Sequence, residues 1–242
     1  MKQVKGIILC EGETDQVLIS SYLGKVRGWT YSRYKNSPFP DDPVEWFKNE
    51  LGEVLGIWPV GGSSFSEPIK KILIRERYEP TVEAIVVVTD HDDSSVENDR
   101  LNNMLDAINT AIAVEGSHEA ICPNQWYRFK VPGDFCEGEV RIGYLLVPLD
   151  EIGALETFML DALSESSPEK ERVIEQSRSF VQGFESDVYL RKRRERTKAE
   201  LGVALAVFSP DKVFSTMKEL IDSVDWSEFA TTDKQFKLLT EI

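Results

Sequence analysis

The chain has few cysteines and no long apolar run, and both absences exclude whole classes of protein. Only three cysteines occur in 242 residues, and Cys10, Cys122 and Cys136 form no Cys-x-x-Cys pair. This argues against a disulfide framework and against a thiolate metal site. No segment approaches the ~20 consecutive apolar residues of a membrane span, and no apolar stretch with a cleavage site follows the first residues. We therefore expect a soluble, cytoplasmic protein with no membrane partner.

Positive charge is also scarce. Lys and Arg number 28 against 42 Asp and Glu, which gives a net charge of −14 and a pI near 4.7. Nucleic-acid affinity depends on neutralising phosphates, so this balance favours nucleic acid only if basic residues are concentrated locally. Six of them fall within residues 191–198, where only Glu195 is acidic. Arg191, Arg194 and Lys198 have the spacing of one helix face and are the predicted nucleic-acid contacts; a solvated helix face is the alternative.

Two acidic clusters follow short apolar runs. Residues 7–10 and 84–89 are continuous in strand-forming residues and too short for a helix, which is typical of buried parallel strands. Such strands deliver the side chains that follow them to the carboxyl edge of a sheet, where open α/β proteins bind ligands. The carboxylates that this places at the edge are Glu11, Asp15, Asp90 and Asp92.

Several carboxylates at one edge repel each other unless a cation neutralises them. An oxygen-rich, sulfur-poor set suits Mg²⁺ or Mn²⁺ better than Zn²⁺. Such a cation can neutralise phosphate oxygens and activate water for displacement at phosphorus. Gly61 and Gly62 end another expected strand before a helix, where the backbone can approach an anion closely; an ordinary turn is the alternative.

The order of the elements predicts an α/β fold. Strands are expected at 4–10, 54–60, 84–89, 126–131 and 140–149, and helices at 14–23, 44–51, 67–77 and 96–114. Alternation of strands and helices predicts a mostly parallel central sheet flanked by helices. Residues 158–242 read as four or five helices, with a joint at 164–168 and a helix start at 209–211, where Pro210 suits the first helical position. We therefore expect a domain over residues 1–160 and an α-helical extension over residues 161–242.

These motifs together resemble the toprim domain. The resemblance rests on strand-Glu-Gly-x-x-Asp, Gly-Gly, strand-Asp-x-Asp and a later Gly-x-Leu-Glu, covers about residues 4–160, and is nearest to the overcoming-lysogenization-defect (OLD-type) nucleases and small stand-alone toprim-like proteins. It implies a Rossmann-like fold and metal-dependent chemistry on phosphodiester bonds. It also implies that Glu11, Asp90 and Asp92 are catalytic, and that Asp15 and Glu156 join them as metal ligands.

The chain departs from the family in some respects. Asp15 is one methylene shorter than the usual glutamate, and no Gly-x-x-x-x-Gly-Lys-Ser/Thr supplies an ATPase. A homodimer or a separately encoded ATPase would be the expected partner, beside DNA or RNA. His91 is expected to be a solvated loop residue, and Glu13 and Asp93 surface charges.

Two other functions compete with a nuclease. The stretch from Asp90 also resembles the Asp-x-Asp-x-Ser loop of haloacid-dehalogenase phosphatases, in which Asp90 would be the nucleophile and Asp92 the general acid. That alternative leaves Glu11 without a role. The third possibility is a partner or sensor protein that keeps the fold and cleaves nothing.

Overall fold

The chain folds around one seven-stranded sheet. The computed structural model describes residues 4–35, 37–62, 64–79, 81–112, 121–133, 138–184, 188–212 and 215–242. The strands are β1 (Val4–Cys10), β2 (Thr30–Tyr31), β3 (Glu45–Lys48), β4 (Val54–Pro59), β5 (Ala84–Asp90), β6 (Trp126–Val131) and β7 (Gly138–Val147). They lie in the order β2-β3-β4-β1-β5-β7-β6. Neighbours among β4, β1, β5 and β7 pair in parallel, while the outer strands pair antiparallel, so the sheet is mostly parallel as expected.

The two central strands are apolar on both faces because helices cover both sides of the sheet. In β1, Ile8 and Cys10 belong to one buried cluster, while Ile7 and Leu9 belong to the cluster on the other face. The same alternation occurs in β5. A strand that is covered on both faces exposes no side chains to solvent and needs no polar residues. This explains the continuous apolar runs of the sequence. The strands predicted from those runs are confirmed.

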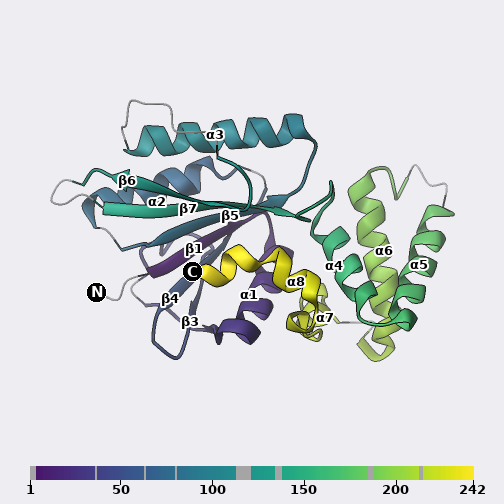
Figure 1. Ribbon diagram of the computed structural model, residues 1–242. Helices are drawn as coiled ribbons and strands as arrows, with labels where there is room; N and C mark the ends of the chain where they lie inside the picture. Colours follow the sequence, from purple (N-terminus) through teal and green to yellow (C-terminus); the bar gives the residue numbers. More distant parts are fainter. Residues whose placement is uncertain are drawn as a thin grey trace.

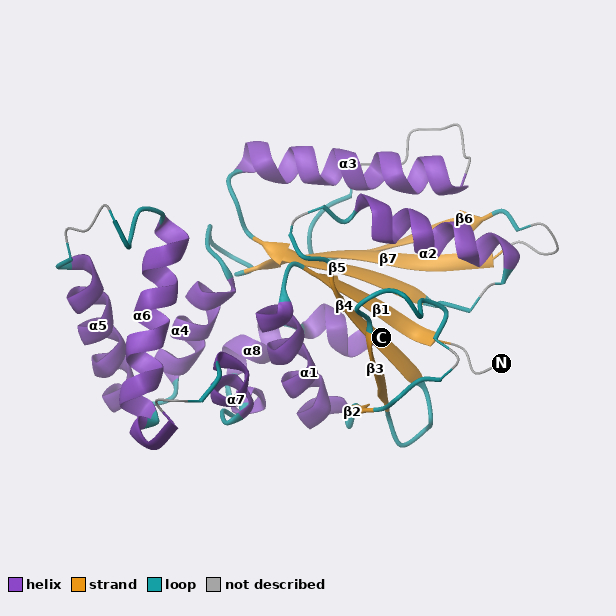
Figure 2. Cartoon of the chain, turned by 180° about the vertical axis from the view of Figure 1, so that it is seen from behind, coloured by secondary structure: helices purple, strands orange, loops and turns teal. Residues whose placement is uncertain are grey.

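The helices form three groups (Figures 1 and 2). The described residues contain eight α-helices: α1 (Glu13–Arg27), α2 (Ser66–Tyr78), α3 (Ser94–Ile112), α4 (Leu155–Glu165), α5 (Pro168–Gln182), α6 (Arg193–Phe208), α7 (Met217–Asp222) and α8 (Ala230–Gln235). Three short 3-10 helices lie at Pro210–Lys212, Trp226–Glu228 and Lys237–Glu241. Helices α2 and α3 cover one face of the sheet, and α1, α7 and α8 the other. Helices α4, α5 and α6 stand beyond the carboxyl ends of the parallel strands.

The helical C-terminal part shares its core with the sheet. An added Cβ at Gly143 in β7 would lie 2.9 Å from the side chain of Leu238, so the last 3-10 helix packs directly on the sheet. Phe236 and Leu239 belong to the same buried cluster as Ile8. The boundary predicted near residue 160 falls inside α4.

One predicted helix is wrong. Residues 44–51 form strand β3 (Glu45–Lys48), paired antiparallel with β4, rather than a helix. Trp46 packs on one face of the sheet and Phe47 on the other, so both faces of this strand are buried. A four-residue strand with only two apolar residues has too few positions to separate the helical and strand periodicities, and pairing with β4 decides its conformation.

Three helix starts differ from expectation. The first helix begins at Glu13, one residue earlier than expected, because it is capped at Gly12, whose N–H donates to Asp15 Oδ2 at 3.0 Å. Helix α6 begins at Arg193 and leaves Arg191 outside it. The segment at Pro210 forms only a 3-10 turn. Cys136 lies outside the described residues.

No helix in the described ranges has the length and apolar character needed to cross a membrane.

Candidate functional site

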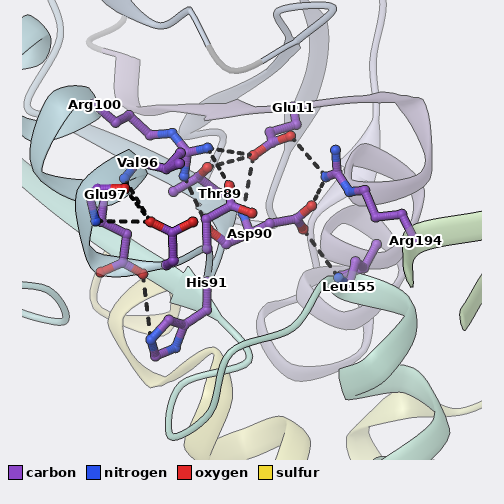
Figure 3. A network of polar contacts seen from close by, with 12 residues as sticks. Glu11, Thr89, Asp90, His91, Val96, Glu97, Arg100, Leu155 and Arg194 are labelled. Carbon is purple, nitrogen blue, oxygen red and sulfur yellow. Dashed lines mark hydrogen bonds and ion pairs between the residues drawn. The ribbon is translucent and has the colours of Figure 1, made fainter. Parts of the chain in front are cut away.

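Glu11 is fixed at the carboxyl edge by the strand beside it. Strands β1 and β5 are parallel neighbours, with Cys10 opposite Val88. Glu11 follows Cys10 directly, and its Oε1 accepts hydrogen bonds from Thr89 Oγ1 at 2.6 Å and from the Asp90 N–H at 3.2 Å (Figure 3). The expectation that the two acidic clusters meet at one edge is therefore confirmed for Glu11 and Asp90.

One arginine from the distant helix α6 joins these two carboxylates. Arg194 Nη2 lies 3.2 Å from Glu11 Oε2 and also forms an ion pair with Asp90 Oδ2 (Figure 3). Asp90 Oδ1 accepts a hydrogen bond at 3.2 Å from the N–H of Leu155, at the start of α4. Asp90 Oδ2 is buried, and Arg194 is its charged partner. A single cationic nitrogen thus faces carboxylates from two adjacent strands.

A second arginine, Arg100 in α3, holds Asp92. Its Nη2 lies 2.8 Å from Asp92 Oδ2 and 3.7 Å from Glu11 Oε1, and its Nη1 donates to the main-chain carbonyl of Asp90 at 3.1 Å. The Arg100 side chain is 7% exposed. Burial of a guanidinium requires such partners, because an unpaired buried charge is costly. Arg100 thereby brings Asp92 into the same network as Glu11 and Asp90.

Asp15 and Glu156 flank this network from two helix starts. Asp15 lies in the first turn of α1 and Glu156 in the first turn of α4, and both are buried. Burial, with the neighbouring charge of Glu11 and a smaller contribution from Glu156, raises the pKa of Asp15 to about 7. Glu156 Oε1 lies 3.6 Å from Lys198 Nζ. We call the five acidic side chains the carboxylate cluster: Glu11, Asp15, Asp90, Asp92 and Glu156.

The glycine pair serves the cluster in a way that the sequence did not indicate. The N–H groups of Gly61 and Gly62 both donate to the main-chain carbonyl of Glu11 at 3.0 Å. Both glycines have positive φ values, 77° and 144°, which suit residues without a Cβ. These N–H groups therefore bind the loop to Glu11 inside the protein, and they are not presented to an external anion as expected.

The basic segment faces the carboxylate cluster. Arg194 contacts Glu11 and Asp90, and Lys198, one helical turn further along α6, contacts Glu156. Arg193 differs, because its Nη2 donates to the carbonyl of Ile152 at 2.8 Å. Arg194 and Lys198 therefore share a helix face, while Arg191 precedes the helix.

His91 is more enclosed than a solvated loop residue. Its side chain is 20% exposed, with Nδ1 2.9 Å from the carbonyl of Pro148 and Nε2 3.5 Å from Glu97 Oε1. The ring turns away from Glu11 toward Glu97 (Figure 3). Glu13 and Asp93 are exposed, as expected.

Two cavities border the network. One of about 430 Å³ lies between the starts of α2 and α3 and is lined by Phe65, Arg100 and Asn103 among others. The second, of about 140 Å³, lies beside Asp92 and Arg194 under the start of α4. Both arginines that hold the carboxylates therefore line a space at the edge of the sheet.

The carboxylate oxygens of the cluster suit a hard metal ion as ligands, but in this structure arginine and lysine side chains neutralise them. Carboxylate oxygens are the ligands that Mg²⁺ and Mn²⁺ prefer, and Glu11 Oε2 and Asp90 Oδ2 converge on one cationic nitrogen of Arg194. Within the described ranges, no three His, Cys, Asp or Glu side chains are grouped so that they could hold a metal ion. Arginines lie between the carboxylates instead, and whether a cation replaces them stays a prediction.

The fold and the site define an α/β protein with a carboxylate and arginine network at the carboxyl edge of its sheet. The family model described as a protein of unknown function, DUF3226, matches residues 5–237, so the chain belongs to this family. Similar solved structures include a hypothetical protein from Pyrococcus horikoshii OT3, with 15% identity and a TM-score of 0.46 over 100% of this chain and 99% of that one. Another is a protein with unknown function from Thermoplasma acidophilum, with 13% identity and a TM-score of 0.27 over 88% and 89%. A comparison with curated proteins finds no match.

Proposed function

We propose that the protein is a Mg²⁺- or Mn²⁺-dependent phosphodiesterase of toprim type that acts on DNA or RNA. The observation that carries the proposal is the contact of one guanidinium nitrogen, Arg194 Nη2, with both Glu11 and Asp90. Two carboxylates from neighbouring parallel strands are thereby directed at one point that already accommodates positive charge. Catalytic cation sites that act on phosphates are built from such converging oxygen ligands.

The topology is consistent with the resemblance to toprim domains. Glu11 and the Asp90–Asp92 pair follow adjacent parallel strands, β1 and β5, in the middle of the sheet. This is the relation that the resemblance implies for the glutamate and the Asp-x-Asp motif. Ligands in open α/β sheets bind at this edge, which supports a substrate site there.

The acidic residues divide between two proposed cation positions. Glu11, Asp90 and Asp92 would hold the first cation, and Asp15 with Glu156 would complete a second position. When bound, the cation supplies neutralisation of phosphate oxygens and a lower pKa for an attacking water. Thr89 and the Asp90 N–H orient Glu11, which leaves Oε2 directed toward Arg194. Arg100 positions Asp92 from the buried side.

The basic residues of α6 would contact the substrate backbone. Arg194 and Lys198 have side chains that are 56% and 63% exposed, so both can leave the carboxylates for phosphate oxygens. Their position next to the cluster meets the requirement for local positive charge on a protein of net charge −14.

The phosphatase alternative explains less of the structure. It requires Asp90 to attack phosphorus, but Asp90 Oδ1 accepts the Leu155 N–H and the side chain is nearly buried. It also gives Glu11 no role, although Glu11 makes contacts with Thr89, Asp90, Arg100 and Arg194.

The test compares two neighbouring carboxylates. Wild-type protein is incubated with plasmid, single-stranded DNA and RNA in Mg²⁺ or Mn²⁺, and cleavage is measured on gels. Asp92→Asn should abolish metal-dependent cleavage with a melting temperature within a few degrees of wild type, because asparagine can still accept the bond from Arg100. Asp93→Asn is the matched control, since Asp93 is exposed and its carboxylate caps Ser95 and Val96 instead of joining the cluster.

Three results would overturn the proposal. Cleavage by Asp92→Asn with normal metal dependence would show that Asp92 is no ligand. A phosphoaspartate trapped at Asp90 would indicate the phosphatase. Absence of cleavage on all three substrates, with tight binding to another protein, would indicate the partner or sensor function.

A further inference from the structure

Three basic side chains neutralise four members of the carboxylate cluster, and they differ in how firmly they are held. Arg100 pairs with Asp92 and Glu11 from a side chain that is 7% exposed. Arg194 and Lys198 pair with the cluster from side chains that are more than half exposed. The side chain of Arg100 is therefore part of the core, whereas the side chains of Arg194 and Lys198 border solvent.

Helix α6 is anchored far from its contacts with the cluster. Leu201, Ala204 and Leu205 in its later turns are buried in the main core. Arg194 lies in the first turn, where none of the residues is buried. The side chain of Arg194 can therefore turn out to solvent while the packed turns of α6 stay in place. Its partners, by contrast, belong to the two central strands or follow them directly.

Arg194 lies at the point toward which Glu11 and Asp90 both turn. Its Nη2 contacts Glu11 Oε2 at 3.2 Å and pairs with the buried oxygen Asp90 Oδ2. A metal ion bound by these two oxygens would need the same space and the same negative charge. Both cations cannot be held there together, because two positive charges at that separation repel strongly in a partly buried site.

We propose that Arg194 is an internal cation that competes with the divalent metal for Glu11 and Asp90, and so keeps the metal affinity of the resting protein low. The inference rests on the proposed function, because it takes Glu11 and Asp90 to be metal ligands. It adds a regulatory step to that function. By linkage, an anionic backbone that draws Arg194 away from the carboxylates raises the affinity for metal. The metal would then bind best when nucleic acid is present.

The experiment measures Mn²⁺ binding without substrate, by the loss of the free-ion signal in electron paramagnetic resonance. Arg194→Gln should bind Mn²⁺ at least about tenfold more tightly than wild type, because the competing charge is gone. Arg194→Lys should lie between the two, since lysine keeps the charge but lacks the fork that reaches two carboxylates. Arg193→Gln is the matched control: it removes the same charge from the same turn but contacts the carbonyl of Ile152. It should change the affinity by less than about twofold.

Asp90→Asn separates the two proposals. If wild type binds Mn²⁺, Asp90→Asn abolishes binding, and Arg194→Gln binds no more tightly than Arg193→Gln, then the metal site stands and the competition is refuted. If neither wild type nor Arg194→Gln binds Mn²⁺ at millimolar concentration while both melt cooperatively, then the metal site itself is refuted, and the competition with it. Tighter binding in Arg194→Gln that Asp90→Asn cancels in the double variant would support both.

Discussion

The raised pKa of Asp15 predicts that one isosteric substitution stabilises the metal-free protein in a pH-dependent way. Asp15 is 8% exposed in the first turn of α1, and burial together with the charge of Glu11 raises its pKa from 3.8 to about 7. Replacing it with asparagine removes the ionisation and keeps an acceptor for the Gly12 N–H, which caps the helix. The substitution therefore isolates the cost of placing this charge in the cluster.

The direction of the effect follows from proton binding. Between pH 4 and pH 7 the folded protein retains a proton on Asp15 that the unfolded chain has released, so stability falls as the pH rises through this range. A pKa raised from 3.8 to about 7 corresponds to about 4 kcal/mol lost above pH 7, which is an upper bound. Asp15→Asn should therefore match wild type near pH 4 and exceed its stability by up to about 4 kcal/mol at pH 8.

Urea unfolding at pH 4, 6 and 8 in EDTA tests this prediction. For a chain of this length, 1 kcal/mol shifts the melting temperature by about 2–4 °C, so the full gain at pH 8 corresponds to a rise of roughly 8–16 °C. Glu13→Gln is the control, because Glu13 is an exposed carboxylate in the same helical turn. It should show no gain that grows with pH. If wild type and Asp15→Asn keep a constant difference from pH 4 to pH 8, the carboxyl of Asp15 is not strained by burial and the argument is refuted.

Two further predictions concern surface charge and backbone support. Arg194→Gln with Lys198→Gln should weaken duplex DNA binding and flatten the dependence of log affinity on log salt by about two, since each phosphate contact contributes ~0.9; fluorescence anisotropy across a salt series measures this, and an unchanged slope would show that α6 does not contact the backbone. Glu76→Ala should destabilise the fold by about 2–4 kcal/mol in urea unfolding, because the buried carboxylate of Glu76 accepts the N–H groups of Thr81 and Val82 just before β5. A loss below about 0.5 kcal/mol would show that water replaces these bonds.

The central sheet could be predicted from sequence because its signal is local. The runs in β1 and β5 are continuous in strand-forming residues and show no helical periodicity. Both faces of these strands are buried, which explains why the runs are apolar throughout. Strand β3 could not be predicted in this way. Its four residues depend on pairing with β4, a contact that no local pattern encodes.

Arg100 is the residue of the site that the sequence reading missed, although a signal for it exists. It lies on the buried face of α3, in line with Met104, Ala107 and Ile108. An arginine on the apolar face of a helix needs an internal partner, because its charge is otherwise buried without compensation. Asp92, eight residues earlier and just before α3, is that partner. A search for charged residues at core positions would have predicted this ion pair.

The basic segment shows that a charge pattern in a sequence does not reveal which part of the protein, or which partner, the charges face. Six basic side chains in eight residues indicate a polyanionic partner, and in this chain the nearest polyanion is the carboxylate cluster itself. Arg194 lies 183 residues from Glu11, so the pair exists only because α4 to α6 stand beyond the carboxyl ends of β1 and β5. An internal cation such as Arg194 neutralises the crowded carboxylates of the metal-free folded protein, but it also weakens metal binding. The same contacts therefore link the stability of the resting protein to the proposed control of its metal site.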